Sequence, residues 1–266
     1  MLYLTKEQFE GIIKHCQREY PKESCGILAG KVYSEQNQSM KKITKVYKMT
    51  NTSDNPEICY FMKPEEQLKV FKEMRQLEIE MLGIYHSHSN SPAYPSQRDC
   101  EMAFYPEADY VIISLKDYNN PVVRAFKIIE GRIEEKNIVV RKNLLFVCVE
   151  NSCRSQIAEA IVNNLYWQRF VAYSAGSKPS GIVNPQAIAV MKEIGIDISE
   201  QKSKGFDQVK NIEFDYVITL GCGEICPVHP GKHRLDWQID DPKDRPIEFF
   251  RKIRDSIHKK IKELIE

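Results

Sequence analysis

The feature that most constrains this chain is a buried-strand pattern that runs directly into a helix pattern near its middle. Residues 143–149, NLLFVCV, form an almost continuous apolar run, and a helix pattern follows over Ser155–Trp167. Strand and helix patterns then alternate to the last residues of the chain. Short apolar strands that alternate with helices are typical of a parallel sheet covered by helices. The second half is therefore predicted to be a doubly wound α/β domain.

The first half has a mixed order of helices and strands. A helix with a Thr5–Gln8 capping box opens it, and a second helix starts near Pro64. The residues expected on the inner face of that second helix are Leu68, Phe71, Met74 and Leu77. Since 266 residues suffice for about two domains, we predict an α/β layer domain over residues 1–137 and the doubly wound domain over 142–266.

Charge and composition exclude several classes of protein. Lys and Arg total 38 against 37 for Asp and Glu, so the chain has no broad field for holding nucleic acid or an anionic membrane. Its apolar runs fall short of the ~18 residues that span a bilayer, and no secretory signal pattern opens the chain. The eight cysteines are too sparse for a disulfide scaffold. These observations predict a cytoplasmic protein.

Cys148 and Arg154 flank the loop between the central strand and the helix that follows it. Amide N–H groups at a helix N-terminus bind oxyanions, and the helix dipole favours a thiolate over a thiol. The planar guanidinium of Arg154 can grip two oxygens of the same anion. The alternative is a buried strand cysteine beside a solvated arginine. At a strand-to-helix turn, we favour a nucleophilic thiolate under a bound tetrahedral anion.

Residues 144–200, which include LLFVCVENSCRSQIAEA and VNPQAIAVMKEIGIDIS, resemble the low-molecular-weight protein tyrosine phosphatases, and more closely the thioredoxin-coupled arsenate reductases of that fold. The resemblance implies that Cys148 is the nucleophile, that Ser155 steadies its thiolate and that Asp241 is the general acid. The residues that it places around the oxyanion are Val149, Glu150, Asn151, Ser152, Cys153 and Arg154. Val149 and Glu150 replace the commoner Thr-Gly of this loop.

Two features favour a reductase over a phosphatase. The segment TLGCGEICP carries Cys222 and Cys226, which the resemblance implies form a thiol relay with Cys148 that thioredoxin would reduce. After Asp241 the chain reads Pro-Lys-Asp-Arg, where the phosphatases carry aromatic residues that hold a phosphotyrosine ring. We therefore expect the reduction of arsenate, with a tyrosine phosphatase as the alternative.

Other interpretations of these residues involve bound metal ions. Cys222, Cys226, His229 and His233 could ligate zinc, although only two residues separate Cys226 from His229. Some relatives hold potassium at positions that match Asn151, Glu159 and Ser174, but here Lys204 takes the place of an expected Asp. Since its ammonium could replace the ion, we expect no cofactor in this domain.

The first half carries a second dense motif, from His86 to Asp99. Histidines two apart at a strand end point to the same side, and Asp99 follows at a predicted helix start. Two imidazoles and a carboxylate can hold zinc with one open position, where water acquires a pKa of about 7. The alternative is structural, because Ser96 and Asp99 also form a capping box.

The motif YHSHSNSPAYPSQRD resembles the signature of the JAMM/MPN+ metalloproteases, and the resemblance covers about residues 1–135. It implies that His86, His88 and Asp99 bind zinc, that Ser96 stabilises an oxyanion and that Glu23 is the general base. It also implies cleavage at the C-terminus of a ubiquitin-like or sulfur-carrier protein. The alternative is a non-catalytic zinc-binding module joined to a phosphatase.

Overall fold

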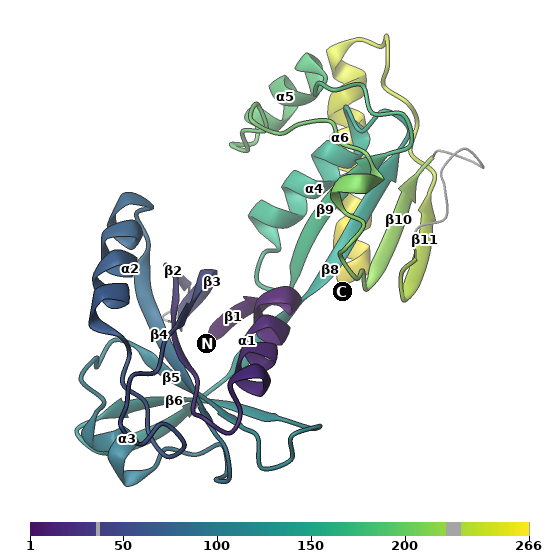
Figure 1. The fold of residues 1–266 in the computed structure, drawn as a ribbon. Coiled ribbons are helices and arrows are strands. Elements are labelled where there is room, and N and C mark those ends of the chain that lie inside the picture. The colour runs from purple at the N-terminus through teal and green to yellow at the C-terminus, as the bar shows by residue number, and fades with distance from the viewer. Residues whose placement is uncertain (36–37, 222–229, 266) are drawn as a thin grey trace. The chain divides into compact units, whose positions relative to one another are not determined.

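The computed structural model describes residues 1–35, 38–221 and 230–265 and divides into two compact units, Met1–Val140 and Arg141–Glu266 (Figure 1). Each unit has its own hydrophobic cores. Among the described residues, no helix has the length and apolar character needed to span a membrane.

Unit 1 is a mixed sheet between helices. Its strands, in spatial order, are β1 (Leu2–Thr5), β3 (Gln38–Met49), β2 (Cys25–Glu35), β4 (Glu80–His88), β5 (Asp109–Ser114), β6 (Val122–Ile129) and β7 (Arg132–Lys136). The pairs β1–β3 and β4–β5 are parallel and the other pairs are antiparallel. Helix α1 (Lys6–Glu19) begins at the predicted capping box, in which Thr5 and Gln8 bond reciprocally.

The two faces of this sheet carry separate cores, because successive strand residues point to opposite sides. Ile84 packs with Val70 and Met74 of α2 (Pro64–Gln76), whereas the next residue, Tyr85, packs with Ile12 and Cys16 of α1. His86 and His88 share the face of Ile84, which is the face that α2 covers. The fold therefore places both histidines at the end of β4 on the α2 side.

Part of the predicted inner face of α2 is wrong. Leu68 is 57% exposed and Leu77 is 48% exposed, while Val70 and Met74 are buried. At 100° per residue, Leu68 lies about 160° around the helix from Val70, and Leu77 is the C-cap residue. Met74 and Phe71 pack on the core as predicted, so apolar spacing identified half of the inner face.

Unit 2 is a parallel sheet in the order β11 (His233–Trp237), β10 (Tyr216–Leu220), β8 (Ile138–Cys148), β9 (Phe170–Gly176). Helices α4 (Arg154–Leu165), α5 (Pro185–Lys192) and α6 (Ile247–Ile265) pack on one face, and a short 3₁₀ helix, η1 (Phe206–Gln208), packs on the other. The predicted fold class, a mixed α/β layer unit followed by a parallel α/β unit, is confirmed. Strands β1, β7 and β11 were not predicted.

The segment between the units differs from the expected join. Strand β8 begins at Ile138, inside the stretch assigned to the boundary, and the Asn137 carbonyl accepts a hydrogen bond from the Leu2 N–H at 2.9 Å. Exposed Val140 and Lys142 alternate with buried Arg141 and Asn143, as the two faces of a strand require.

Two candidate active sites

Three side chains of unit 1 converge on one point. The Nε2 atoms of His86 and His88 lie 3.1 Å apart, and each lies 3.2–3.3 Å from a carboxylate oxygen of Asp99. A tetrahedral zinc ion with bonds of about 2.0–2.1 Å separates its ligand atoms by about 3.3–3.4 Å. These donor atoms are therefore spaced like three corners of a zinc tetrahedron, and their nitrogen and oxygen donors suit that ion.

Neighbouring groups fix the orientation of these ligands. The Nδ1 of His88 lies 2.9 Å from the Pro92 carbonyl, which can only accept, so Nδ1 carries the hydrogen and, in the neutral ring, Nε2 keeps its lone pair. Burial lowers the pKa of His86, which favours the neutral ring that a metal requires. Burial opposes ionisation of Asp99, but its contacts with both imidazoles and the hydrogen bond from Ser96 hold the pKa of this carboxyl well below its usual range.

Ser96 and Asp99 form the predicted capping box at the start of α3 (Gln97–Glu101). The Ser96 hydroxyl and the Ser96 N–H both donate hydrogen bonds to Asp99 Oδ2, at 2.6 and 2.7 Å. Capping and convergence on the histidines thus occur together, because one carboxylate accepts from Ser96 and also faces both imidazoles. The structural interpretation of this motif does not displace the metal interpretation.

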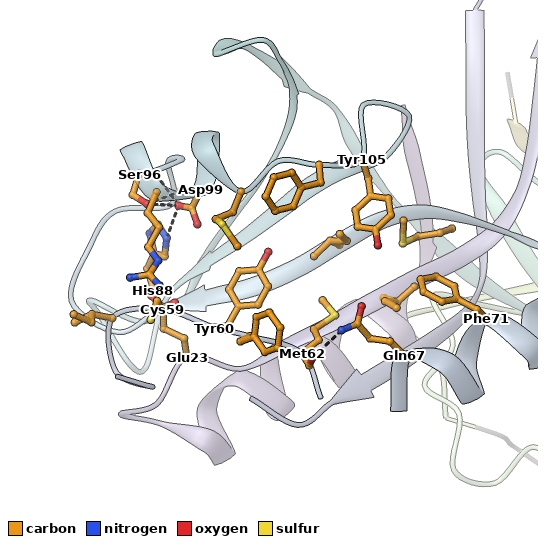
Figure 2. A pocket seen from close by; sticks show the side chains of 18 residues that line it. Glu23, Cys59, Tyr60, Met62, Gln67, Phe71, His88, Ser96, Asp99 and Tyr105 are labelled. Carbon is orange, nitrogen blue, oxygen red and sulfur yellow. Dashed lines mark hydrogen bonds and ion pairs between the residues drawn. The ribbon is translucent and has the colours of Figure 1, made fainter. Parts of the chain in front are cut away.

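Glu23 lies in the loop before β2 and is 6% exposed. It lines one cavity of about 290 Å³ with His88, Ser96 and Asp99. Figure 2 shows these four side chains at one end of the cavity, with Tyr60, Met62 and Phe71 extending away from them. Burial raises the pKa of Glu23 to about 7, a value suited to taking up and releasing a proton near neutral pH.

Two residues that the sequence did not single out support this site. The amide of Asn51 donates to the carbonyls of Glu23 and Cys59 at 2.8 and 3.0 Å, and the Tyr60 ring stacks on His86 with centroids 4.7 Å apart. The turn-like text NTSDNP signals a loop at Asn51. Nothing in the sequence signals that the loop reaches Glu23.

The second site surrounds Cys148, the last residue of β8, and Arg154, the first residue of α4. The carbonyls of Val149, Glu150, Asn151 and Ser152 all accept hydrogen bonds from outside the loop. In a trans peptide the N–H points away from the carbonyl of the same plane, so these bonds turn the following amides inward. The loop therefore presents N–H groups to the space beside Cys148, as an oxyanion cradle requires.

Hydrogen bonds also orient the sulfur's nearest polar neighbour. Asn151 Nδ2 donates to Ser155 Oγ at 2.8 Å, which leaves the Ser155 hydroxyl hydrogen free to point at Cys148 Sγ, 3.0 Å away. Asn151 adopts the left-handed conformation, with φ 48°, that its side chain tolerates better than most. Burial raises the pKa of the neighbouring Cys153 thiol, which favours a packing role for that residue.

Arg154 and Asp241 meet across the same cavity, which has a volume of about 270 Å³. The guanidinium bonds Asp241 Oδ2 at 2.9 Å and the Ile239 carbonyl at 3.0 Å. Arg154 is buried and Asp241 is more exposed, and both line the cavity. A group bound on Cys148 would therefore lie beside a paired guanidinium and carboxylate.

Lys204 occupies the position where an ammonium was expected to replace an ion. Its Nζ lies 2.8 Å from Glu159 Oε2 and 3.2 Å from Ser174 Oγ, and its N–H donates to Asn151 Oδ1 at 2.7 Å. Cys222, Cys226 and His229 lie outside the described residues, so the relay and the rival zinc set stay predictions. His233, the remaining member of that set, begins β11 and stacks on Tyr216.

Comparison with known proteins divides the chain in the same way. Residues 5–129 match the prokaryotic homologs of the JAB domain, and residues 143–266 match the low molecular weight phosphotyrosine protein phosphatase family. Over 136 residues the chain is 43% identical to an arsenate reductase of Halalkalibacterium halodurans, covering 47% of this chain and 96% of that protein.

Two further relatives are informative. A glutaredoxin arsenate reductase of Synechocystis sp. is 39% identical over 127 residues, covering 47% of this chain and 96% of that protein. A CysO-cysteine peptidase of Mycobacterium bovis is 31% identical over 140 residues, covering 53% of this chain and 91% of that protein. Nearly the whole length of each relative is thus represented in one half of this chain.

Proposed function

Because the chain belongs to two families, with a prokaryotic JAB-domain unit followed by a unit of the low molecular weight phosphotyrosine protein phosphatase family, we propose that it is a bifunctional enzyme. Unit 2 reduces arsenate to arsenite through its thiols. Unit 1 hydrolyses, with zinc, a peptide or isopeptide bond at the C-terminus of a sulfur-carrier or ubiquitin-like protein.

The observation that supports the reductase is the inward-facing amide loop around Cys148. Arsenate binds to these amides and to the Arg154 guanidinium, and the Cys148 thiolate displaces one oxygen, which Asp241 protonates so that it leaves as water. The Cys222 thiolate then attacks the sulfur of Cys148. The electron pair of the broken arsenic–sulfur bond stays on arsenic, which leaves as arsenite, and a Cys148–Cys222 disulfide forms.

The remaining steps return the thiols to their starting state. The Cys226 thiolate attacks Cys222, which releases Cys148 as a thiolate and leaves a Cys222–Cys226 disulfide. A dithiol protein donates the two electrons that reduce this disulfide. We propose thioredoxin as that donor, and the name of the Synechocystis relative makes glutaredoxin the competing candidate.

A coupled assay tests the reductase. Purified protein should consume thioredoxin reducing equivalents only when arsenate is present, and Cys148→Ser should abolish this consumption. Cys222→Ser should trap arsenic on Cys148, and Cys226→Ser should leave a Cys148–Cys222 disulfide, both detectable by mass mapping. Rapid hydrolysis of an aryl phosphate without thiol consumption would instead identify a phosphatase, and turnover with glutaredoxin alone would reassign the donor.

The observation that supports the peptidase is the zinc-like spacing of His86, His88 and Asp99 beside Glu23. Zinc bound to these three residues would polarise the scissile carbonyl and activate water for hydrolysis. Glu23, largely buried and with a pKa near 7, takes up a proton and delivers it to the leaving amine. Ser96 donates its hydroxyl hydrogen to the carbonyl oxygen of the substrate. The apolar remainder of the cavity receives the extended C-terminal tail.

Glu23→Gln separates binding from catalysis. It should retain about one zinc per chain by elemental analysis and lose cleavage of a sulfur-carrier protein that bears cysteine on its C-terminus. The matched control, Glu19→Gln, changes a carboxylate on α1 outside this cavity. Unchanged cleavage by Glu23→Gln would remove Glu23 from the mechanism. Zinc and carrier binding without cleavage by the wild type would favour a non-catalytic module.

A further inference from the structure

The cavity above Cys148 is bounded by two ion pairs that connect the same two segments. Arg154 joins the start of α4 to the 239–244 segment through Asp241, at 2.9 Å. Glu150, inside the anion loop, joins that segment a second time, through Lys243 at 2.6 Å. These four charged side chains line the cavity that also contains Cys148, together with a fifth, Asp244. The 148–154 stretch and the 239–244 segment are thus joined by two ion pairs.

The Glu150–Lys243 pair is built on a fixed backbone. The Glu150 carbonyl accepts hydrogen bonds from the Ser180 N–H at 3.0 Å and the Ser203 hydroxyl at 2.8 Å. On the other side, the Lys243 N–H donates to Asp241 Oδ1 at 3.1 Å. The same Asp241 carboxylate is held by Arg154. Lys243 therefore touches both carboxylates, one through its backbone and one through its ammonium.

A carboxylate at this position needs an explanation, because it stands beside a site for anions. Two like charges several ångströms apart repel by about 1 kcal/mol even in a watery environment. The ammonium of Lys243 cancels the charge of Glu150, as the guanidinium of Arg154 cancels that of Asp241. The side-chain charges within each pair sum to zero, so an incoming anion meets the inward amides with one uncompensated carboxylate nearby, Asp244, rather than three.

We propose that the Glu150–Lys243 pair is a specificity element of this cavity: it admits a small inorganic tetrahedral anion and excludes phosphate esters with a bulky aryl group. The proposal rests on the anion-binding role proposed for the Cys148 loop. An inorganic anion fits between Cys148 and Arg154. The organic group of an ester must extend past the Glu150–Lys243 pair, whose side chains are 39% and 58% exposed. Covering them would remove their water, and no aromatic wall offers compensation.

Protection of Cys148 tests the electrostatic part without any turnover. Iodoacetamide alkylates Cys148, inorganic phosphate protects it, and mass mapping follows this one thiol. Lys243→Met should raise the half-protecting phosphate concentration about fivefold, since Glu150 loses its counter-charge. Adding Glu150→Gln to Lys243→Met should return the half-protecting phosphate concentration to the wild-type value. The charge-swap variant, Glu150→Lys with Lys243→Glu, should have a half-protecting concentration within about threefold of wild type.

A matched control removes another exposed lysine of the same unit. Lys232 pairs with Asp215 at 2.8 Å and does not line the cavity, so Lys232→Met should leave phosphate protection unchanged. An equal loss in both lysine variants would show an effect of net charge and overturn the proposal, as would failure of the double variants to restore protection. No protection in the wild type would overturn the anion site itself, and with it this proposal.

Hydrolysis of 4-nitrophenyl phosphate tests the steric part. The double variant Glu150→Gln, Lys243→Met removes both charges while leaving the net charge unaltered. For each protein, kcat/KM for the ester is divided by its affinity for phosphate. This ratio should be about tenfold higher in the double variant than in wild type, which corresponds to a barrier lower by about 1.4 kcal/mol. An unchanged ratio would overturn the selection against esters.

Discussion

The Ser155 hydroxyl determines whether the Cys148 sulfur faces a hydrogen-bond donor or an acceptor. Ser155 Oγ accepts from Asn151 Nδ2 and keeps one hydrogen, which it can donate to the Cys148 sulfur 3.0 Å away. A donor aimed at the sulfur stabilises its anionic form more than its neutral form, because hydrogen bonds to charged groups are the stronger ones. Asn151 is in turn held by the Lys204 N–H and by Gln156. The Ser155 hydroxyl beside the nucleophile is therefore oriented by the side-chain amides of Asn151 and Gln156, rather than by a neighbouring base.

Ser155→Ala should slow the alkylation of Cys148 by iodoacetamide at pH 7 about tenfold, since the thiolate loses a charge-assisted hydrogen bond. Mass mapping of the modified cysteine measures this directly. Ser152→Ala is the matched control, because the Ser152 hydroxyl contacts Glu150 at 3.4 Å and is not placed on the sulfur. Equal rates in wild type and Ser155→Ala would show that this hydroxyl does not support the thiolate.

Site residues that lie close together in the sequence could be predicted from their spacing. Contacts between residues far apart in the sequence could not. His86, His88, Ser96 and Asp99 lie within one strand end and one helix start, so their spacing already implies convergence. The Glu150–Lys243 pair joins positions far apart in the chain, and Asn51 holds a carbonyl of another loop. A single sequence carries no signal for either contact.

At the scale of elements, unit 2 depends on a lysine that connects three of them. Lys204 precedes η1, and its ammonium contacts Glu159 of α4 and Ser174 of β9. The side chains of Lys204 and Glu159 are only 18% and 13% exposed, so each charge relies on the other. Breaking a buried pair by removing one partner leaves the other charge uncompensated.

Lys204→Met should lower the free energy of unfolding of unit 2 by about 2 kcal/mol. The chain has two tryptophans, Trp167 and Trp237, both in unit 2, so their fluorescence during urea unfolding reports on this unit. Glu159→Gln added to Lys204→Met should recover part of the loss. Lys192→Met, which breaks an exposed 3.9 Å pair, should change stability by at most about 0.5 kcal/mol. A full-sized loss in the double variant would contradict this explanation.

Helix α1 gives unit 1 a pH dependence. His15 packs edge-on against Tyr85 of β4, with Nδ1 2.9 Å from the tyrosine hydroxyl. Burial lowers the pKa of His15; Lys48 and Arg18 add to this, and Glu19 opposes it. The unfolded chain therefore binds the proton more readily than the folded one. Stability contributed by neutral His15 is complete above pH 6.5 and falls as the pH drops toward the lowered folded value.

Hydrogen exchange of α1 peptides, corrected for the intrinsic rates, should thus show protection falling between pH 7 and pH 5. His15→Gln keeps a polar side chain that does not titrate, and its protection should fall less over the same interval. Comparing the two proteins cancels the contribution of every other titrating group. Parallel pH profiles would show that His15 does not control the stability of this helix.

Element types could be predicted more completely than element edges. The alternating strands and helices of unit 2 follow from apolar runs, and the capping boxes at Thr5 and Ser96 mark two helix starts. Strand β11 is mostly polar and exposed. It is held in the sheet by its pairing with β10, in which Tyr216 pairs with His233. Such a strand has no apolar pattern of its own, so only its neighbour reveals it.

At the scale of the whole molecule, the two sites are chemically separate. The candidate zinc ligands all belong to unit 1, and the anion loop belongs to unit 2; each unit has its own hydrophobic cores. Zinc should therefore be required by one activity only. This expectation distinguishes the thiol relay from the rival interpretation, in which Cys222, Cys226, His229 and His233 bind a zinc ion of their own.

Removing zinc with a chelator should abolish cleavage of the carrier protein and leave arsenate reduction within about twofold of the untreated rate, since thiol exchange needs free thiolates and no metal. Elemental analysis before treatment should find one zinc per chain, and none in a variant with alanine at His86 and His88. Cys148→Ser provides the reciprocal control, because it should stop arsenate reduction and leave cleavage intact. Two zinc ions per chain, with arsenate reduction rising as the second is removed, would show that zinc occupies the relay cysteines. The redox role of Cys222 and Cys226 would then depend on metal release.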